Sequence, residues 1–186
     1  MAQQEKTAAL SVSDKIAKGK ELKELGNAEY KSAGTDSKKL TLAIRHYYNA
    51  IAYFSGLDNA QFQALMPGQK SAPLSDAVKA DVEKNIIACY NNMAACQVKL
   101  ERWERVIVNS DQVLKKAPSN AKALYRRGQA HLAMNDLTKA ENDLQKAAEL
   151  EPTDSGIKSE LSKLKKRNQE YELKQKKEWA GMFDRK

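Results

Sequence analysis

The sequence predicts an all-α protein, a solenoid of three helix–turn–helix repeats closed by a long C-terminal helix. Three observations predict this fold. Only 8 glycines and 4 prolines occur in 186 residues, so few residues interrupt a helix. Charged residues make up 30% of the chain, as in helices whose outer faces are solvated. Pro118 and Pro152 lie 34 residues apart, and the segments that end at these prolines share a pattern of small and apolar residues.

The segment 119–152 shows the repeating unit most clearly. Its small and apolar positions match the 34-residue tetratricopeptide repeat, in which two helices pack closely against each other. These positions are Leu124, Gly128, Ala140, Leu144 and Ala147. We expect helices at 120–134 and 137–150, because Pro152 cannot readily continue the second helix.

Two earlier segments, 14–55 and 76–118, repeat this pattern. In 76–118 the corresponding positions include Ala94 and Val113, and Trp103 lies at the turn between the helices. In 14–55 the corresponding positions are Leu25, Gly26, Ala43, Tyr47 and Ala50. The helices expected in these two repeats are 14–33, 38–55, 76–100 and 102–116.

The remaining segments flank or connect the repeats. Residues 1–13 are expected to be a flexible N-terminus, and residues 56–75 a loop that ends at Ser75, the N-cap of the next helix. The repeat domain then spans 14–153, and 154–186 forms a capping helix with a basic extension. A solenoid needs such a cap because its last repeat has no neighbour to cover its apolar face. The residues expected to cover that face are Ile157, Leu161 and Leu164.

Composition narrows the classes of function. No apolar run reaches the length of a membrane span, and the N-terminus lacks the apolar stretch of a signal peptide. Cys89 and Cys96 lie too far apart on one helix to pair, so we expect free thiols and a cytoplasmic protein, with the nucleus as a further location. His46 and His131 have no second ligand at metal spacing, and no catalytic set is present. We therefore expect no enzyme activity, no cofactor and no metal.

Charge and spacing predict an anionic peptide ligand. The net charge is +8, which favours an acidic partner. The first helix of each repeat lines the concave face of such a solenoid, and five polar residues are expected there. They are Lys23 and Asn27, Asn92, and Lys122 and Arg126. Lys and Arg bind carboxylates strongly and carboxamides donate hydrogen bonds, so this groove suits an acidic C-terminus. None of the five is expected to pack against a neighbouring helix.

Three short segments carry a family resemblance. LKELGN at 22–27, NNMAAC at 91–96 and KALYRRGQAHL at 122–132 resemble the three-repeat domains of Hsp90 and Hsp70 co-chaperones. The resemblance is closest to immunophilin-type domains and to the tetratricopeptide repeat protein 9 family. It implies that the five groove residues form a carboxylate clamp for the EEVD C-terminus of the chaperone. It also implies a neighbouring pocket for the peptide, formed by Tyr30, Ala95, Val98 and Lys99.

The predicted function is therefore a co-chaperone adaptor for Hsp90, with Hsp70 as a further candidate partner. One alternative is a repeat scaffold that binds an unrelated protein motif. Another is a fragment of a peptidyl-prolyl isomerase, because immunophilins usually carry an isomerase domain ahead of the repeats and only about twenty residues precede them here. The basic tail is interpreted as a solvated helix, with calmodulin or an acidic membrane surface as alternative partners. Nucleic acid is not expected as a partner.

Overall fold

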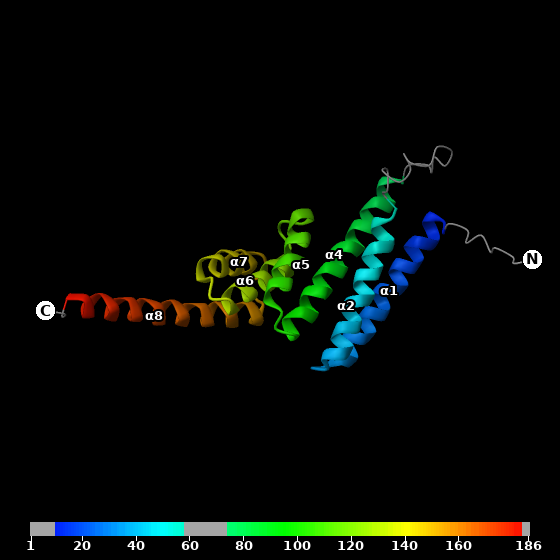
Figure 1. The fold of residues 1–186 in the computed structure, drawn as a ribbon. Coiled ribbons are helices and arrows are strands. Elements are labelled where there is room, and N and C mark those ends of the chain that lie inside the picture. The colour runs from blue at the N-terminus through cyan, green and yellow to red at the C-terminus, as the bar shows by residue number, and fades with distance from the viewer. Residues whose placement is uncertain (1–9, 58–73, 184–186) are drawn as a thin grey trace, which may run out of the picture. The chain divides into compact units, whose positions relative to one another are not determined.

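The computed structural model describes residues 10–57 and 74–183, and Figure 1 shows the path of the chain. These residues form helices joined by short turns. The helices are α1 (Val12–Ala33), α2 (Ser37–Ser55), α4 (Asp76–Lys99), α5 (Trp103–Lys116), α6 (Ala121–Ala133), α7 (Leu137–Leu150) and α8 (Ser155–Phe183). The all-α prediction is confirmed, and each of the six helices expected in the repeats begins and ends within two residues of the observed bounds. Most of the expected flexible N-terminus and of the expected loop 56–75 lies outside the described residues.

The chain divides into two compact units. Met1–Cys96 is called here the N-terminal unit and contains α1, α2 and most of α4. Gln97–Lys186 is called the C-terminal unit and contains α5 to α8. The boundary between the two units falls within α4.

In the N-terminal unit, α1 and α2 form a helical hairpin with clear end signals. Ser11 and Asp14 make a reciprocal capping box at the start of α1. Asp36 caps α2 by accepting hydrogen bonds from two backbone amides. Gly34 connects the helices with a φ of 53°, a conformation that glycine adopts without a steric penalty. The two helices are therefore defined by local sequence as well as by packing.

Two glycines let α1 approach the aromatic side chains of α2. A Cβ atom at Gly26 would lie 2.7 Å from the Tyr47 ring, and one at Gly19 would lie 2.6 Å from the Phe54 ring. Both rings are almost fully buried. The hairpin is thus built around glycine–aromatic contacts, as the small residue expected at position 26 indicated.

Gly26→Ala is expected to destabilise the protein, although alanine is the better helix former by about 1 kcal/mol. The added methyl group overlaps the buried Tyr47 ring, and overpacking of this kind costs about 1–3 kcal/mol. Urea denaturation of the two proteins measures the difference. The double variant Gly26→Ala, Tyr47→Leu should recover part of the loss. A single variant as stable as the parent protein would contradict the close contact.

One residue assigned to the core of this hairpin was placed incorrectly. Leu25 was expected at a packing position, but its side chain is 44% exposed. Leu22 is partly buried and stands four residues before Gly26, as Leu124 stands four residues before Gly128. Leu22 and Leu25 are three residues apart, and a pattern with a period of 3.6 residues does not separate them well.

The C-terminal unit repeats the hairpin with α6 and α7. A Cβ atom at Gly128 would lie 2.8 Å from the buried Leu144 side chain. A single guanidinium links three helices of this unit, since Arg127 of α6 contacts Asp111 of α5 at 2.6 Å and Asp143 of α7 at 2.7 Å. The hydrogen bonds that Arg127 donates to Asp143 raise the pKa of Arg127 above its ordinary value. The unit is therefore held by apolar packing and by a partly buried charge network.

The first half of α8 covers the α6–α7 hairpin, as expected. Ile157 packs with Leu124 and Ala147, and Leu164 packs with Leu132 and Leu144. Leu161 is partly buried against both groups. The capping role assigned to these residues is confirmed.

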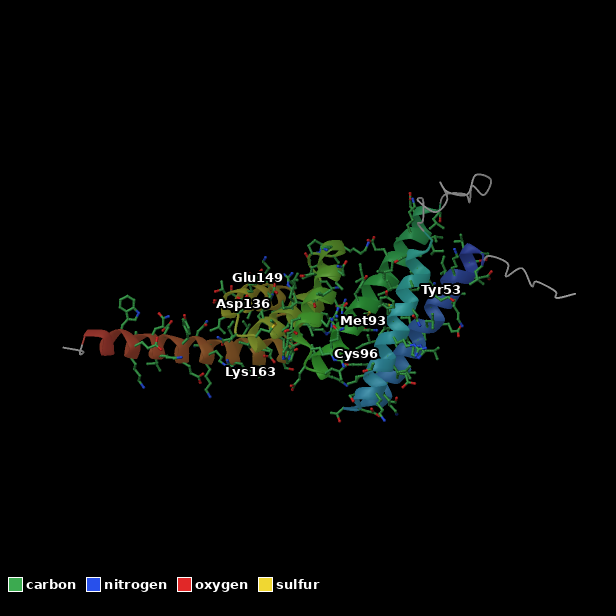
Figure 2. All side chains as sticks on the ribbon, in the orientation of Figure 1. Tyr53, Met93, Cys96, Asp136, Glu149 and Lys163 are labelled. Atoms are coloured by element: carbon green, nitrogen blue, oxygen red, sulfur yellow. The ribbon has the colours of Figure 1, made fainter. Side chains whose placement is uncertain are left out.

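Among the residues that the structure describes, none covers the second half of α8 in this way. All residues from 169 to 180 are exposed, and Figure 2 shows their side chains extending from the helix into solvent. Tyr171 and Trp179 are exposed by 55% and 59%. The interpretation of this segment as a solvated helix is confirmed, and calmodulin or a membrane surface as partners stays a prediction.

Candidate functional site

The site in the N-terminal unit is organised around the amide of Asn27. Its Oδ1 atom accepts a hydrogen bond from the Tyr47 hydroxyl at 2.9 Å and another from Asn92 Nδ2 at 2.9 Å. Tyr47 is fully buried, and burial raises the pKa of its hydroxyl above the ordinary value, so the group remains a donor. Asn27 of α1 is therefore bonded to α2 and α4 at one atom. This contact brings together two of the residues predicted for the clamp.

Lys23 is also held within the N-terminal unit. Its Nζ donates to Asn85 Oδ1 at 2.8 Å, and the Lys23 side chain is only 21% exposed. Asn85 is buried on α4 and its own amide donates to the carbonyl of Asp81 at 2.8 Å. This second contact fixes the acceptor that Lys23 meets. The ammonium of Lys23 thus lies one helical turn before the amide of Asn27.

These contacts correct one expectation from the sequence. Lys23, Asn27 and Asn92 were expected to leave neighbouring helices untouched, but Lys23 and Asn27 both bond to side chains of α4. The reason is physical, since a polar group that is partly buried needs partners for its donors and acceptors. The three residues therefore contribute to the structure of the N-terminal unit as well as to any ligand site.

Asn27→Ala is accordingly expected to lower stability by about 1–3 kcal/mol, because the buried Tyr47 hydroxyl would lose its acceptor. Thermal or urea unfolding measures this loss. Tyr47→Phe provides the control, since it removes the donor of the same bond. The double variant should lose less than the sum of the two single losses. Strictly additive losses would contradict an Asn27–Tyr47 interaction.

In the C-terminal unit, Lys122 and Arg126 lie four residues apart on α6. Asn120 caps this helix by accepting from the backbone amide of Ala123 at 3.0 Å. Lys122 is exposed and Arg126 is partly buried. Residues at this spacing share a helix face, so the two cations lie side by side. The convergence of all five clamp residues on one groove stays a prediction.

The four pocket residues differ in accessibility. In the N-terminal unit, Tyr30 is partly buried on α1, and Ala95 is only 9% exposed on α4. In the C-terminal unit, Val98 is partly buried and Lys99 is exposed in the last turn of α4. Lys99 has the most accessible side chain of the four. Their role as a peptide pocket stays a prediction.

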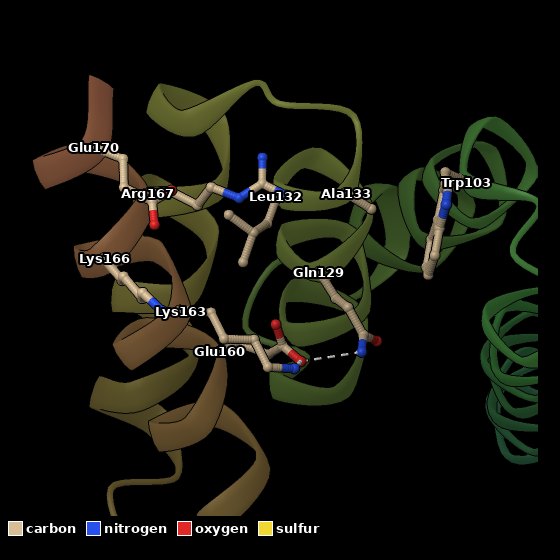
Figure 3. Close-up of a pocket in the computed structure, with 9 residues that line it drawn as sticks. All are labelled: Trp103, Gln129, Leu132, Ala133, Glu160, Lys163, Lys166, Arg167 and Glu170. Carbon is tan, nitrogen blue, oxygen red and sulfur yellow. Dashed lines mark hydrogen bonds and ion pairs between the residues drawn. The ribbon is translucent and has the colours of Figure 1, made fainter. Parts of the chain in front are cut away.

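The C-terminal unit contains a cavity of about 380 Å³ that was not predicted from the sequence (Figure 3). It is lined by Trp103 from α5, by Gln129, Leu132 and Ala133 from α6, and by Glu160, Lys163, Lys166, Arg167 and Glu170 from α8. Gln129 and Ala133 continue the face of α6 that carries Lys122 and Arg126, because they follow at seven and eleven residues from Lys122. This spacing is the signal that could have placed them.

Glu160 gives this cavity a buried charge. The residue is 6% exposed, and its Oε1 atom accepts from Lys163 Nζ at 2.8 Å and from Gln129 Nε2 at 3.3 Å. The bond to Glu160 raises the pKa of Lys163. Through its bond with Gln129, this carboxylate connects α8 to α6.

The described ranges contain neither a metal-type cluster nor a long apolar helix. Over residues 10–57 and 74–183, no three His, Cys, Asp or Glu side chains are grouped as a metal site would require. No helix in the described part of the chain is long and apolar enough to cross a membrane. The absence of a metal, a cofactor and an enzyme activity stays a prediction.

Comparison with known proteins places the chain among repeat proteins. A model of the tetratricopeptide repeat family matches residues 121–154. A peptidyl-prolyl cis-trans isomerase of Arabidopsis thaliana, FKBP42, is 32% identical over 174 residues, which make up 94% of this chain and 43% of the relative. The chain therefore spans less than half the length of this curated relative.

Two solved structures share the fold. The C-terminal TPR-containing domain of an FK506-binding protein of Plasmodium falciparum is 26% identical and has a TM-score of 0.72, over 88% of this chain and 97% of that domain. The first TPR of Spaghetti (RPAP3), solved with the HSP90 peptide SRMEEVD, is 22% identical and has a TM-score of 0.58, over 81% of this chain and 93% of that one. The predicted resemblance to tetratricopeptide-repeat domains of immunophilins and Hsp90 co-chaperones is confirmed.

Proposed function

We propose that the chain is a non-catalytic adaptor. The proposal starts from its tetratricopeptide-repeat domain, which is similar to those of FKBP immunophilins and Hsp90 co-chaperones. Its ligand is the acidic EEVD C-terminus of Hsp90, and the C-terminus of Hsp70 is a second ligand of the same chemistry. The clamp consists of Lys23, Asn27, Asn92, Lys122 and Arg126.

The observation that carries this proposal is the fixed orientation of Asn27. Its Oδ1 atom is engaged by Tyr47 and Asn92, so its Nδ2 donor faces away from these two partners. A donor held in one orientation loses little entropy when it binds a carboxylate. Lys23 lies one turn earlier on the same helix and adds a positive charge beside this donor.

Two further observations support the ligand class. Lys122 and Arg126 provide a second pair of donors at the spacing of one helix face, which suits a ligand with more than one carboxylate. The structure of the RPAP3 repeat domain contains a peptide that ends in EEVD, and that domain shares the fold of this chain. Both points favour a peptide with a free acidic end.

A peptide ending in EEVD is expected to bind at least about tenfold more tightly as the free acid than as the C-terminal amide. Amidation removes one charged acceptor, and a hydrogen bond to a charged group contributes about 1.5–3 kcal/mol. Isothermal titration calorimetry with the two forms of one peptide measures the ratio. Equal affinities would contradict the proposed clamp and favour a scaffold that recognises an internal motif.

The two alternative functions, a scaffold and an isomerase fragment, can be distinguished from this proposal by experiment. A scaffold for an unrelated motif would bind neither form of the peptide, whereas an isomerase fragment would bind the free acid as proposed. The intact mass of the cellular protein, compared with 20.8 kDa for this chain, separates an adaptor from a fragment. We place the activity in the cytoplasm and, as a second location, the nucleus. The buried thiols of Cys89 and Cys96, which are not joined in a disulfide, support a reducing compartment.

A further inference from the structure

Glu24 places a carboxylate of the protein itself against two of the proposed clamp residues. Its Oε2 atom accepts a hydrogen bond from Asn27 Nδ2 at 3.0 Å. Its Oε1 atom lies 3.4 Å from Lys23 Nζ. One carboxylate therefore contacts the same amide and the same ammonium that the ligand carboxylate is proposed to use.

The contact with Asn27 follows from how this amide is fixed. Because its oxygen accepts from Tyr47 and Asn92, flipping the amide would leave both donors without their acceptor. The Nδ2 group must then remain on the side of Glu24, which stands three residues earlier on α1. The ligand site and the Glu24 site therefore use the same donor.

The charge of Glu24 is maintained by this contact. The hydrogen bond from Asn27, together with Lys23, lowers the pKa of the Glu24 carboxyl below its ordinary value. Its side chain is nevertheless 67% exposed, so the carboxylate can rotate into water without leaving a buried charge. A group that is charged, in contact and easily displaced has the properties of a reversible competitor.

We propose that Glu24 is an internal competitor of the peptide ligand, which occupies Asn27 Nδ2 and Lys23 Nζ until a ligand carboxylate displaces it. The inference rests on the proposed function, because it concerns the same clamp. Glu24 weakens binding in two ways: the ligand must break its contacts, and its negative charge repels the incoming carboxylate. Ligands with several carboxylates overcome this opposition more readily than ligands with one.

Calorimetry with the free-acid EEVD peptide tests the proposal on the full chain. Glu24→Ala is expected to bind about three- to tenfold more tightly than the parent protein, the range for an exposed charge near a ligand charge. Glu24→Gln, which can keep the hydrogen bond to Asn27 but has no charge, should give a smaller gain. Raising the salt concentration to about 0.5 M should reduce both gains, because the repulsion is screened.

Glu21→Gln is the matched control. Glu21 is also an exposed glutamate of α1, and replacing it with glutamine changes the net charge equally. Its carboxylate, however, pairs with Lys18 at 2.9 Å. Its effect on affinity should be less than about twofold. A gain equal to that of Glu24→Gln would show a general charge effect and overturn the proposal.

The remaining outcomes separate this inference from the proposed function. If the parent protein binds the peptide and Glu24→Ala binds it with equal or lower affinity, the proposal that Glu24 competes with the ligand is wrong, and the proposed clamp stands. If neither protein binds the peptide, the proposed function fails and the inference fails with it. Circular dichroism of each variant checks the fold, which should be unchanged because Glu24 is exposed.

Discussion

Replacing both Lys122 and Arg126 with alanine is expected to weaken binding of the free-acid EEVD peptide by about a hundredfold or more. In the proposed clamp each residue supplies a charge-assisted hydrogen bond to a carboxylate, and each such bond contributes about 1.5–3 kcal/mol. Two losses of this size exceed two orders of magnitude in affinity. Isothermal titration calorimetry measures the change.

The fold should survive this double substitution. Lys122 is exposed and Arg126 is only partly buried, and the core contacts of α6 are made by other residues, including Leu124 and Gly128. The double variant Lys146→Ala, Lys158→Ala is the control, because it removes two exposed lysines of α7 and α8 and changes the charge equally. Unchanged affinity in the α6 variant would refute the clamp. An equal loss in the control would indicate nonspecific attraction.

The second large effect is expected from removing α8. A chain that stops after Pro152 lacks Ile157 and Leu164, which are 2% and 3% exposed in the full chain. Burying such a side chain contributes roughly 1.5–3 kcal/mol, so the truncated chain should melt well below the full chain or aggregate. Differential scanning fluorimetry and light scattering measure both outcomes.

A stop after Arg167 provides the contrast. It keeps Leu164 and the hydrogen bond from Arg167 to Asn135, and it removes the exposed residues 169–180. Its melting temperature should stay close to that of the full chain. If instead both truncated chains are destabilised by the same amount, the second half of α8 is also needed for stability.

The helices were predictable because several local signals agreed. Repeat spacing, apolar periodicity and the prolines at 118 and 152 pointed to the same boundaries. Which apolar residue of a helix belongs to the core was harder to predict. Leu25 was predicted there, but Leu22 is the more buried of the two. Neighbouring apolar residues on a helix compete for the same face, and only the partner helix decides between them.

The partners of the proposed clamp residues were not predictable from spacing. Lys23 bonds to Asn85, 62 residues away, and Asn27 bonds to Asn92, 65 residues away. Pattern analysis identifies which residues share a helix face but contains no information on which distant side chain satisfies a donor. Glu24 was overlooked for a related reason, since an exposed glutamate on a charged helix has no distinguishing pattern.

The two buried thiols of the N-terminal unit can be used to measure how often this unit opens. Cys89 and Cys96 are both 0% exposed, and burial raises the pKa of Cys89 to about 12. The thiolate is the form of cysteine that attacks an alkylating reagent, so neither side chain can react at neutral pH until α4 separates from its packing. The rate of alkylation therefore reports the free energy of that separation. If ligand binding closes the unit around Asn27 and Asn92, the peptide will slow the labelling of cysteines that it never touches.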